Sequence, residues 1–253
     1  MDKRVENRTE AVVYDIVKAV RGVLDKHDVT FEEYRAGVGF LMQYAQAAPF
    51  EIPLSCDLWF NATIHDIEMK SRKGSVTALE GPYFKEDIPV VTDALRTLDG
   101  VGQDMVIEGR VTNLEGQPLE GAEVFIWHSD PDGFYSGFCD YMPEPTYYRG
   151  RLTVAADGRY RVRSSMPAPY TIPHDGPTGQ LLDTMGRHPW RPAHVHFKVR
   201  APGMLEHITQ AYFADGAYVN DDCVEGVRPA LVHALGDQDG TFVLTKDFVL
   251  DPA

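Results

Sequence analysis

The first part of the chain repeats apolar residues at helical spacing. Over residues 12–24 the apolar positions recur every three or four residues, and charged residues occupy the opposite side. The apolar positions are Val13, Ile16, Val17, Val20, Val23 and Leu24. We therefore predict an amphipathic helix over residues 12–24. Its apolar stripe is too large to be buried by the helix alone, so we expect it to pack on the rest of the chain or on a second copy.

Two further helices are predicted before residue 75. Thr30-Phe31-Glu32-Glu33 has the S/T-x-x-E form of a capping box, in which the threonine and the glutamate satisfy backbone donors at a helix start. The second helix should then run to about Ala47, and Pro49 and Pro53 should end it. Residues 57–70 contain few glycines or prolines and are predicted to form the third helix.

The pattern changes after Gly74 to short β-branched or aromatic runs separated by turn sequences such as Asp130-Pro131-Asp132-Gly133. The predicted strands lie within residues 105–107, 124–127, 159–162, 195–200, 208–213 and 242–250. Strands at this spacing, without helices between them, favour a β-sandwich. We predict a mainly β protein with a helical N-terminal domain over residues 1–78 and a β-sandwich domain over residues 79–253.

Composition narrows the classes of function. The 253 residues include 24 Lys or Arg and 38 Asp or Glu, a net charge of −14, which argues against a nucleic-acid-binding protein. No stretch approaches the roughly 20 apolar residues needed to span a bilayer, and no apolar segment follows the N-terminal Met-Asp-Lys-Arg. The three cysteines are unpatterned. A cytoplasmic protein, neither secreted nor inserted in a membrane, is therefore expected.

The candidate chemistry begins at His194 and His196. On a strand these alternate residues project to one face, so two imidazoles could chelate one metal ion. The alternative is a pair of polar residues on a solvated face, and imidazole alone does not choose among iron, copper and zinc. A cupin-type metal site needs a glutamate four or five residues further on, where Arg200 and Ala201 stand instead.

Two tyrosines extend this candidate site. Tyr135 and Tyr170 lie in loops rich in glycine and proline. A phenolate is a hard anionic ligand, and loss of its proton from a reference pKa of about 10 requires a strongly Lewis-acidic ion such as ferric iron. Both residues could equally be amphipathic packing residues among the twelve tyrosines of the chain.

At this point the sequence resembles a known family, the intradiol ring-cleavage dioxygenases. The run Gly186-Arg187-His188-Pro189-Trp190-Arg191-Pro192-Ala193-His194-Val195-His196-Phe197 is similar to the family's signature around its two histidine ligands. The loop of Tyr135 and Pro169-Tyr170 match its two tyrosine ligands, at intervals of 35 and 24 residues. Within the family the chain looks most like the chlorocatechol 1,2-dioxygenases, and this likeness is carried by the runs at residues 34–39, 81–84, 127–133, 166–170 and 221–223. The hydroxyquinol 1,2-dioxygenases are the nearest alternative, and an unsubstituted-catechol 1,2-dioxygenase is a further one.

The resemblance implies an enzyme of aromatic catabolism that inserts O2 between the two hydroxyl-bearing carbons of a (chloro)catechol and yields a (chloro)-cis,cis-muconate. It implies one Fe(3+) per subunit, held by Tyr135, Tyr170, His194 and His196, with Tyr170 displaced by the substrate. Arg191 would place a fixed positive charge against the substrate ring, and Gln210 would hydrogen-bond near Arg191 or a ligand. It also implies a homodimer formed through the N-terminal helices, with phospholipid between them as an option.

The substrate pocket that the resemblance implies is lined by Leu54, Asp57, Leu58, Leu79, Gly81, Pro82, Tyr83, Ile172, Arg191 and Cys223. Without the family, the three leucines would be assigned to core packing. Asp57 could accept a hydrogen bond from a third substrate hydroxyl, which favours hydroxyquinol, or could cap the third helix. Glu80 stands where the chlorocatechol enzymes carry Gln, and Leu58-Trp59 replaces a smaller residue followed by Phe.

A noncatalytic binding module is the alternative from another class. Residues 106–111 and 116–124 also resemble transthyretin-like and adhesin sandwich repeats, which carry no chemistry. Such a module needs fewer than about one hundred residues, whereas this chain adds a helical domain and four candidate ligands. Bound iron would separate the two interpretations.

Overall fold

The computed structural model describes residues 7–253 of the chain. The chain divides into two compact units, Met1–Ala48 and Pro49–Ala253. Residues 49–78, which were predicted to belong to the helical N-terminal domain, are grouped with the sheets in this division.

The first unit contains two helices, α1 (Arg8–Lys26) and α2 (Phe31–Gln46). Helix α1 begins at Asn7, whose side chain accepts a hydrogen bond from the backbone N–H of Glu10 at 2.9 Å. The predicted capping box of α2 is confirmed, because Thr30 and Glu33 each accept from the backbone N–H of the other. None of the residues of α1 is buried within this chain.

The second unit begins with one continuous helical segment. It comprises α3 (Glu51–Cys56), a π-helical turn (Asp57–Asn61) and α4 (Ala62–Glu68). The predicted start of the third helix at residue 57 is therefore wrong by six residues. Pro53 does not break this helix because it lies in the first turn, where its missing N–H would have had no intrahelical acceptor.

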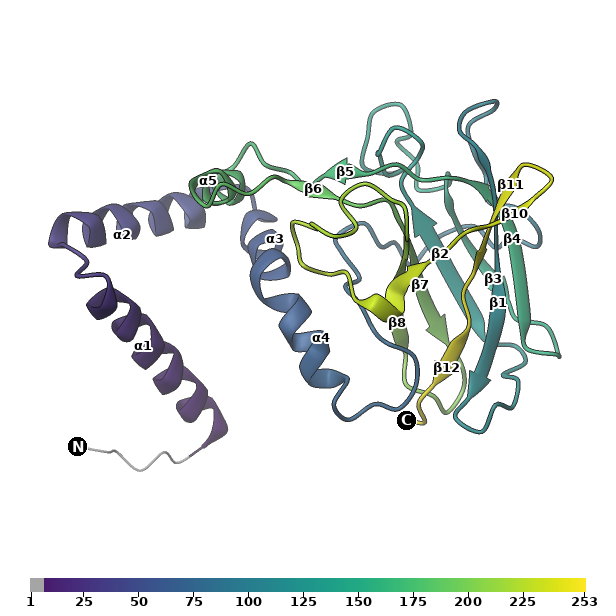
Figure 1. The fold of residues 1–253 in the computed structure, drawn as a ribbon, viewed down its shortest axis with the longest axis horizontal. Coiled ribbons are helices and arrows are strands. Elements are labelled where there is room, and N and C mark those ends of the chain that lie inside the picture. The colour runs from purple at the N-terminus through teal and green to yellow at the C-terminus, as the bar shows by residue number, and fades with distance from the viewer. Residues whose placement is uncertain (1–6) are drawn as a thin grey trace. The chain divides into compact units, whose positions relative to one another are not determined.

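The remaining chain forms two five-stranded sheets and a short two-stranded one (Figure 1). In the first sheet β1 (Asp104–Asn113) pairs with β4 (Arg159–Ser165), β11 (Thr241–Thr245) and β12 (Phe248–Leu250), and β10 (Gly236–Gln238) pairs with β11. The second sheet has the order β3 (Arg149–Thr153), β2 (Glu123–His128), β7 (His194–Arg200), β8 (His207–Phe213), β9 (Val232–His233). The small sheet pairs β5 (Tyr170–Thr171) with β6 (Trp190–Arg191).

The predicted β-sandwich is confirmed. Each predicted strand lies within an observed one, except that residues 242–250 form two strands, β11 and β12, separated at Lys246-Asp247. Five strands were not predicted, namely β3, β5, β6, β9 and β10, and neither were the helix α5 (Pro177–Thr184) and the 3-10 turn Pro229–Leu231.

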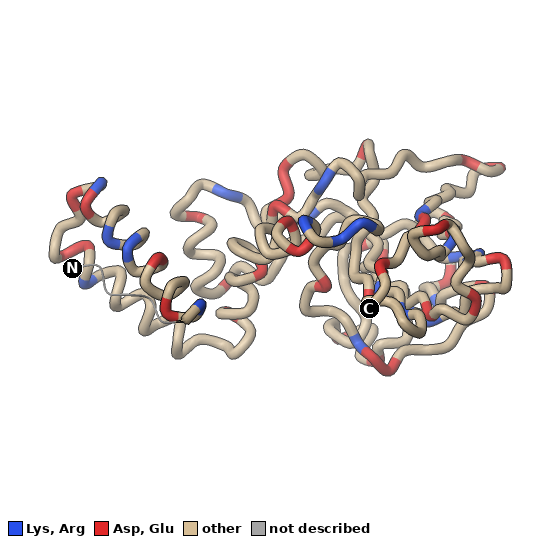
Figure 2. The backbone as a smooth tube through the Cα atoms, turned by 90° about the horizontal axis from the view of Figure 1, so that it is seen from below, with Lys and Arg blue, Asp and Glu red and all other residues tan. Residues whose placement is uncertain are grey.

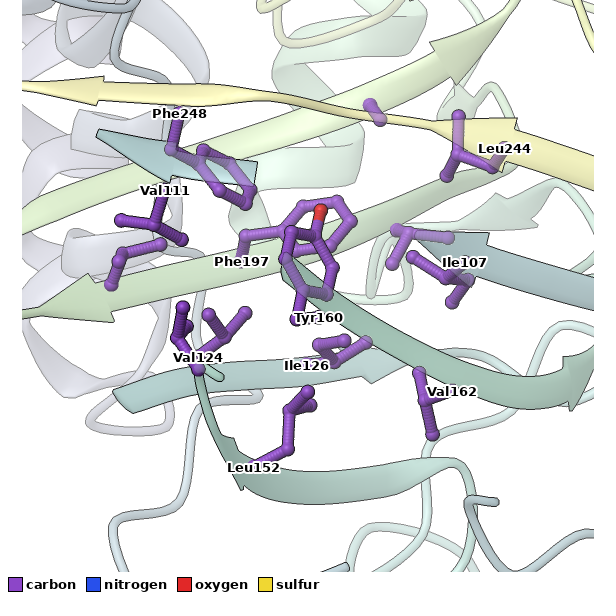
Figure 3. Packing of buried hydrophobic residues seen from close by; sticks show 14 of the residues in the cluster. Ile107, Val111, Val124, Ile126, Leu152, Tyr160, Val162, Phe197, Leu244 and Phe248 are labelled. Carbon is purple, nitrogen blue, oxygen red and sulfur yellow. The ribbon is translucent and has the colours of Figure 1, made fainter. Parts of the chain in front are cut away.

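The core lies between the two five-stranded sheets (Figure 3). Ile107 and Val111 of β1 share it with Ile126 of β2 and Phe197 of β7, and all four are fully buried. The hydroxyl of Tyr160 in this core donates to the backbone carbonyl of Lys246 at 2.6 Å. One face of β7 packs into this core through Phe197 and its alternate neighbours, so the other face of β7 can carry the candidate site.

Charge is distributed along both units. Figure 2 shows Lys and Arg interspersed with Asp and Glu along the backbone, in keeping with the excess of acidic residues. Among residues 7–253, no helix combines the length and the apolar character that crossing a membrane requires.

Candidate active site

Strand β7 places two histidines side by side at the centre of the second sheet. Val195 and Phe197 point into the sandwich core, so His194 and His196 lie on the opposite face, where each is 1% exposed. Their Nε2 atoms are 3.0 Å apart. Nδ1 of His194 lies 2.7 Å from the carbonyl oxygen of Pro192 and donates a hydrogen bond to it. Nε2 of His194 therefore carries a lone pair directed into the site.

The loop between β2 and β3 brings Tyr135 to these histidines. The phenol oxygen of Tyr135 lies 3.2 Å from Nε2 of His196. The buried carboxylate of Asp130 accepts from the backbone N–H groups of Asp132 (3.0 Å) and Phe134 (2.8 Å), which fixes the turn before Tyr135.

Tyr170, on β5, reaches the same place. Its ring centroid lies 5.3 Å from that of Tyr135 and 5.6 Å from that of His194. Gly133 permits this approach because its φ is +90° and a Cβ there would lie 2.8 Å from the carbonyl oxygen of Pro169. The four residues predicted as metal ligands are therefore brought together from three segments far apart in the sequence.

The protonation states suit a cation site. Burial, with the neighbouring Arg191, lowers the pKa of His194 well below its usual value, and burial beside His194 does the same for His196. Both imidazoles are neutral, as metal ligands must be. Burial raises the pKa of Tyr135 well above its usual value and also raises that of Tyr170. Two phenolates at this site would therefore require a strongly Lewis-acidic ion.

The donor set fits iron. Within residues 7–253 there is no cluster of three or more His, Cys, Asp or Glu side chains that could hold a metal. The donors that meet at this site are two imidazoles and two phenols. Hard phenolates combined with imidazoles match a ferric ion. Two phenolates and one hydroxide would balance its three positive charges, which lowers the cost of burying the centre.

Arg191 and Gln210 lie against the histidines. The Nη1 atom of Arg191 is 3.3 Å from Nε2 of His194, and its Nη2 atom is 3.1 Å from Oε1 of Gln210. Gln210 Nε2 donates to the carbonyl of Leu79 at 2.8 Å and lies 3.2 Å from Nδ1 of His196. Two other partners of Arg191, Asp222 and Tyr212, were not predicted from the sequence, because nothing in their own sequence neighbourhood assigns a role to either side chain.

A small cavity adjoins the four candidate ligands. It is lined by Leu54, Asp57, Leu79, Gly81, Pro82, Tyr83, Tyr170, Ile172, Pro173, Arg191 and Val224. Leu58 and Cys223 belong to the apolar cluster beside it, and the Cys223 thiol donates to the carbonyl of Pro189 at 3.3 Å. Pro173 and Val224 were not predicted. A wider hollow of about 480 Å³ shares Tyr83, Tyr170, Ile172 and Pro173 with the cavity.

Two acidic residues beside the cavity have partners. Asp57 Oδ1 accepts from Asn61 Nδ2 at 2.7 Å, inside the π-helical turn. The predicted helix-capping role of Asp57 is wrong, because the helix is continuous through this residue and has no N-terminus there. Glu80 forms an ion pair with Lys198, whose side chain is 5% exposed.

Comparison with known proteins agrees with this arrangement. The family model described as "Dioxygenase" matches residues 79–252, and the model "Catechol dioxygenase N terminus" matches residues 6–75. A chlorocatechol 1,2-dioxygenase from Cupriavidus pinatubonensis is 45% identical over 254 residues, covering 100% of this chain and 97% of the relative.

Solved structures give the same result. The crystal structure of a chlorocatechol 1,2-dioxygenase from Pseudomonas putida matches with a TM-score of 0.90 and 46% identity, covering 99% of this chain and 100% of that one. A hydroxyquinol 1,2-dioxygenase from Pseudomonas putida matches with a TM-score of 0.88 and 27% identity, covering 98% and 93%. Two family models together spanning nearly the whole chain, and relatives matched over their full length, place this protein in the family of intradiol ring-cleaving dioxygenases.

Proposed function

We propose that this enzyme cleaves the ring of chlorinated catechols between the two hydroxyl-bearing carbons, with O2 as co-substrate, and releases chloro-cis,cis-muconates. The observation that carries the proposal is the convergence of two imidazoles and two phenols on one buried place beside a small, mostly apolar cavity. Relatives at 45% and 46% identity are named chlorocatechol 1,2-dioxygenases, which supports this substrate class.

The proposed cofactor is one Fe(3+) per subunit, held by Tyr135, Tyr170, His194 and His196. When bound, ferric iron supplies Lewis acidity and accepts electron density from a catecholate, which makes a ring carbon reactive toward O2. Burial raises the pKa of Tyr170, although Arg191 and the hydrogen bond from Tyr135 lower it in part. A phenolate is a base, so the oxygen of Tyr170 is suited by its place at the cavity wall to take a proton from a substrate hydroxyl.

The other residues bind and orient the substrate. Arg191 is fully buried and directs Nη1 toward His194, so its positive charge is held at the side where the electron-rich ring would lie. Leu54, Leu79 and Ile172 exclude water from the cavity and give an apolar surface to a chlorine substituent. Gly81 contributes no side chain, and a Cβ there would lie 3.4 Å from Cε1 of His196.

The test is a visible spectrum of the purified protein before and after anaerobic addition of 4-chlorocatechol, with iron analysis of the same sample. A red-brown tyrosinate-to-iron band that shifts on addition of substrate is expected, and Tyr135→Phe should change it. Tyr14→Phe is the matched control, because it also removes one tyrosine hydroxyl, and Tyr14 is neither a candidate ligand nor a residue of the cavity wall. A protein that stays colourless and inactive after ferric reconstitution would leave only the binding-module alternative.

Hydroxyquinol is the second candidate substrate. The observation that favours it is the Asp57 carboxylate on the cavity wall, which could accept a hydrogen bond from a third hydroxyl. The ratio of kcat/KM for 4-chlorocatechol, catechol and hydroxyquinol decides between them. Asp57→Asn should lower kcat/KM selectively for hydroxyquinol if the third hydroxyl binds there, and should leave the ranking unchanged if a chlorinated ring does.

The N-terminal unit is proposed to mediate a homodimer. Seven large apolar residues of α1 are 43–58% exposed in the single chain, namely Val12, Val13, Tyr14, Ile16, Val17, Val20 and Val23. An apolar face of this extent normally packs against a partner, and a second copy is the proposed one. Light scattering should give twice the chain mass, and Ile16→Glu with Val20→Glu should give the monomer. Mass spectrometry of a solvent extract would detect phospholipid between the helices.

A further inference from the structure

Asp222, a buried aspartate outside the predicted site, accepts two hydrogen bonds from the guanidinium of Arg191. The side chain of Asp222, in the loop after β8, is 1% exposed. Its Oδ1 atom accepts from Nε of Arg191 at 3.2 Å, and its Oδ2 atom accepts from Nη2 of Arg191 at 3.2 Å. The same two oxygens accept from the backbone N–H groups of Val224 (3.4 Å) and Gly226 (3.1 Å). Four donors therefore fix the carboxylate.

The Nη1 atom of the guanidinium, which does not contact Asp222, faces the candidate metal centre. Nη1 of Arg191 lies 3.3 Å from Nε2 of His194, and Nη2 also donates to Oε1 of Gln210 at 3.1 Å and to the hydroxyl of Tyr212 at 2.9 Å. A guanidinium is planar and its donors have fixed directions. The two-point contact with Asp222 therefore sets the direction in which Nη1 points.

The packing leaves little room for another arrangement. A Cβ added to Gly226 would lie 3.2 Å from Nη2 of Arg191 and 3.2 Å from the hydroxyl of Tyr212, so a glycine lets the backbone close over the pair. Arg191 and Asp222 are both buried, and their opposite charges cancel. An arginine buried here without its carboxylate would be strongly destabilised.

We propose that Asp222 is a positioning residue for ring cleavage: it orients the Arg191 guanidinium toward the reacting ring and balances its charge, without touching substrate or metal itself. This inference rests on the proposed function. It predicts that the effect of Asp222 on kcat depends on the presence of Arg191.

The test is a double-mutant cycle on the iron-loaded enzyme with Asp222→Asn, Arg191→Gln and the double variant. Asp221→Asn is the matched control, because Asp221 is the adjacent residue, its side chain is 79% exposed, and it contacts His188 instead of Arg191. We would measure kcat and KM for 4-chlorocatechol, bound iron, the substrate-shifted visible band and the thermal midpoint of each variant. A cycle of this kind separates effects that pass through one residue from independent ones.

In the wild-type background, Asp222→Asn should lower kcat by roughly ten- to one-hundredfold, with bound iron retained. This is less than the roughly 10²- to 10³-fold loss that follows removal of an electrostatic donor itself, because Arg191 is still present. Asp221→Asn should stay within about twofold, as a surface change does. In the Arg191→Gln background, Asp222→Asn should leave kcat and the visible band unchanged and should raise the thermal midpoint, because it removes a buried carboxylate that has lost its cation.

An equal fall of kcat in both backgrounds, or a fall no larger than that of Asp221→Asn, would overturn the proposal. If Asp222→Asn alone does not fold, the comparison of Arg191→Gln with the double variant still decides, since a further loss of kcat or of thermal midpoint there contradicts it. If the wild-type enzyme cleaves no diol, the proposed function fails. The thermal midpoints still test the Arg191–Asp222 pair, because Asp222→Asn should lower the midpoint in the wild-type background and raise it in the Arg191→Gln background.

Discussion

Replacement of Glu80 by Gln removes the closest counter-charge of a buried lysine. The side chain of Lys198 is 5% exposed, and it forms an ion pair with Glu80, which is 36% exposed. A second carboxylate, that of Glu206, lies 3.8 Å from Nζ, and the ring of Phe84 lies 3.6 Å from it. Glu80→Gln therefore leaves Lys198 with a weaker pairing, at the residue next to cavity-lining Gly81.

The size of the effect follows from this exposure. Loss of one partner from a fully buried pair costs about 3–5 kcal/mol, and an exposed pair contributes about 0.2–1 kcal/mol. Glu80 is about one-third exposed and Glu206 remains nearby, so we expect a loss of about 1–2 kcal/mol of unfolding free energy. For a chain of this length that corresponds to a fall in Tm of roughly 2–8 °C.

Guanidinium unfolding and Tm measurements check this, with Glu86→Gln as the matched control. Glu86 is 61% exposed and pairs with Arg200, two residues from Lys198 on the same face of β7. Glu86→Gln should cost no more than about 0.5 kcal/mol. Because Glu80 ties the cavity-lining segment to β7, KM for 4-chlorocatechol should rise in Glu80→Gln more than kcat falls. Equal losses of unfolding free energy in the two variants would refute the reasoning.

Three further predictions follow from the contacts. Glu51→Ala should lower the unfolding free energy by about 2–3 kcal/mol. The reason is that the buried Glu51 carboxylate accepts from the N–H (3.0 Å) and the hydroxyl (2.6 Å) of Thr178 in the first turn of α5. Denaturant unfolding measures this loss, and the control substitution Glu68→Ala should lower the unfolding free energy by under about 1 kcal/mol. Burial lowers the pKa of His128 to about 4, below its unfolded value near 6.5, so its contribution to stability is full above about pH 6.5 and is lost as the pH falls through 4. His128→Gln should flatten the dependence of unfolding free energy on pH between those values, and an unchanged slope would count against the burial argument. Gly81→Ala should cost about 1–2 kcal/mol through its positive φ of 71° and should raise KM for 4-chlorocatechol, while a KM equal to that of the parent enzyme would contradict its place on the cavity wall.

Local patterns allowed much of the fold to be predicted. The capping box at Thr30 depends only on residues three apart, and the β-branched runs within β1, β2, β7 and β8 depend on alternation along one strand. The errors occurred where tertiary contacts decide. Helix α3 begins at Glu51 despite Pro53. The carboxylate of Glu51 accepts a hydrogen bond from the first turn of α5, a helix that was not predicted from the sequence.

The candidate site divides in the same way. His194-Val195-His196 and the loops of Tyr135 and Tyr170 could be recognised because each lies in its own motif, and the intervals between them match a known family. No role could be assigned from the sequence to Asp222, Tyr212, Pro173 or Val224. Their place beside Arg191 or the cavity depends on how loops far apart in the sequence pack.

The sequence by itself determined the class of architecture, because alternation on a strand and helix capping are properties of neighbouring residues. The family and the candidate ligands came from its resemblance to known motifs. The tertiary structure alone decided which groups balance the buried charges. Arg191 and Lys198 are paired with Asp222 and Glu80 from other segments. A buried cation must have a counter-charge within a few ångströms, and only the folded chain brings that partner into contact.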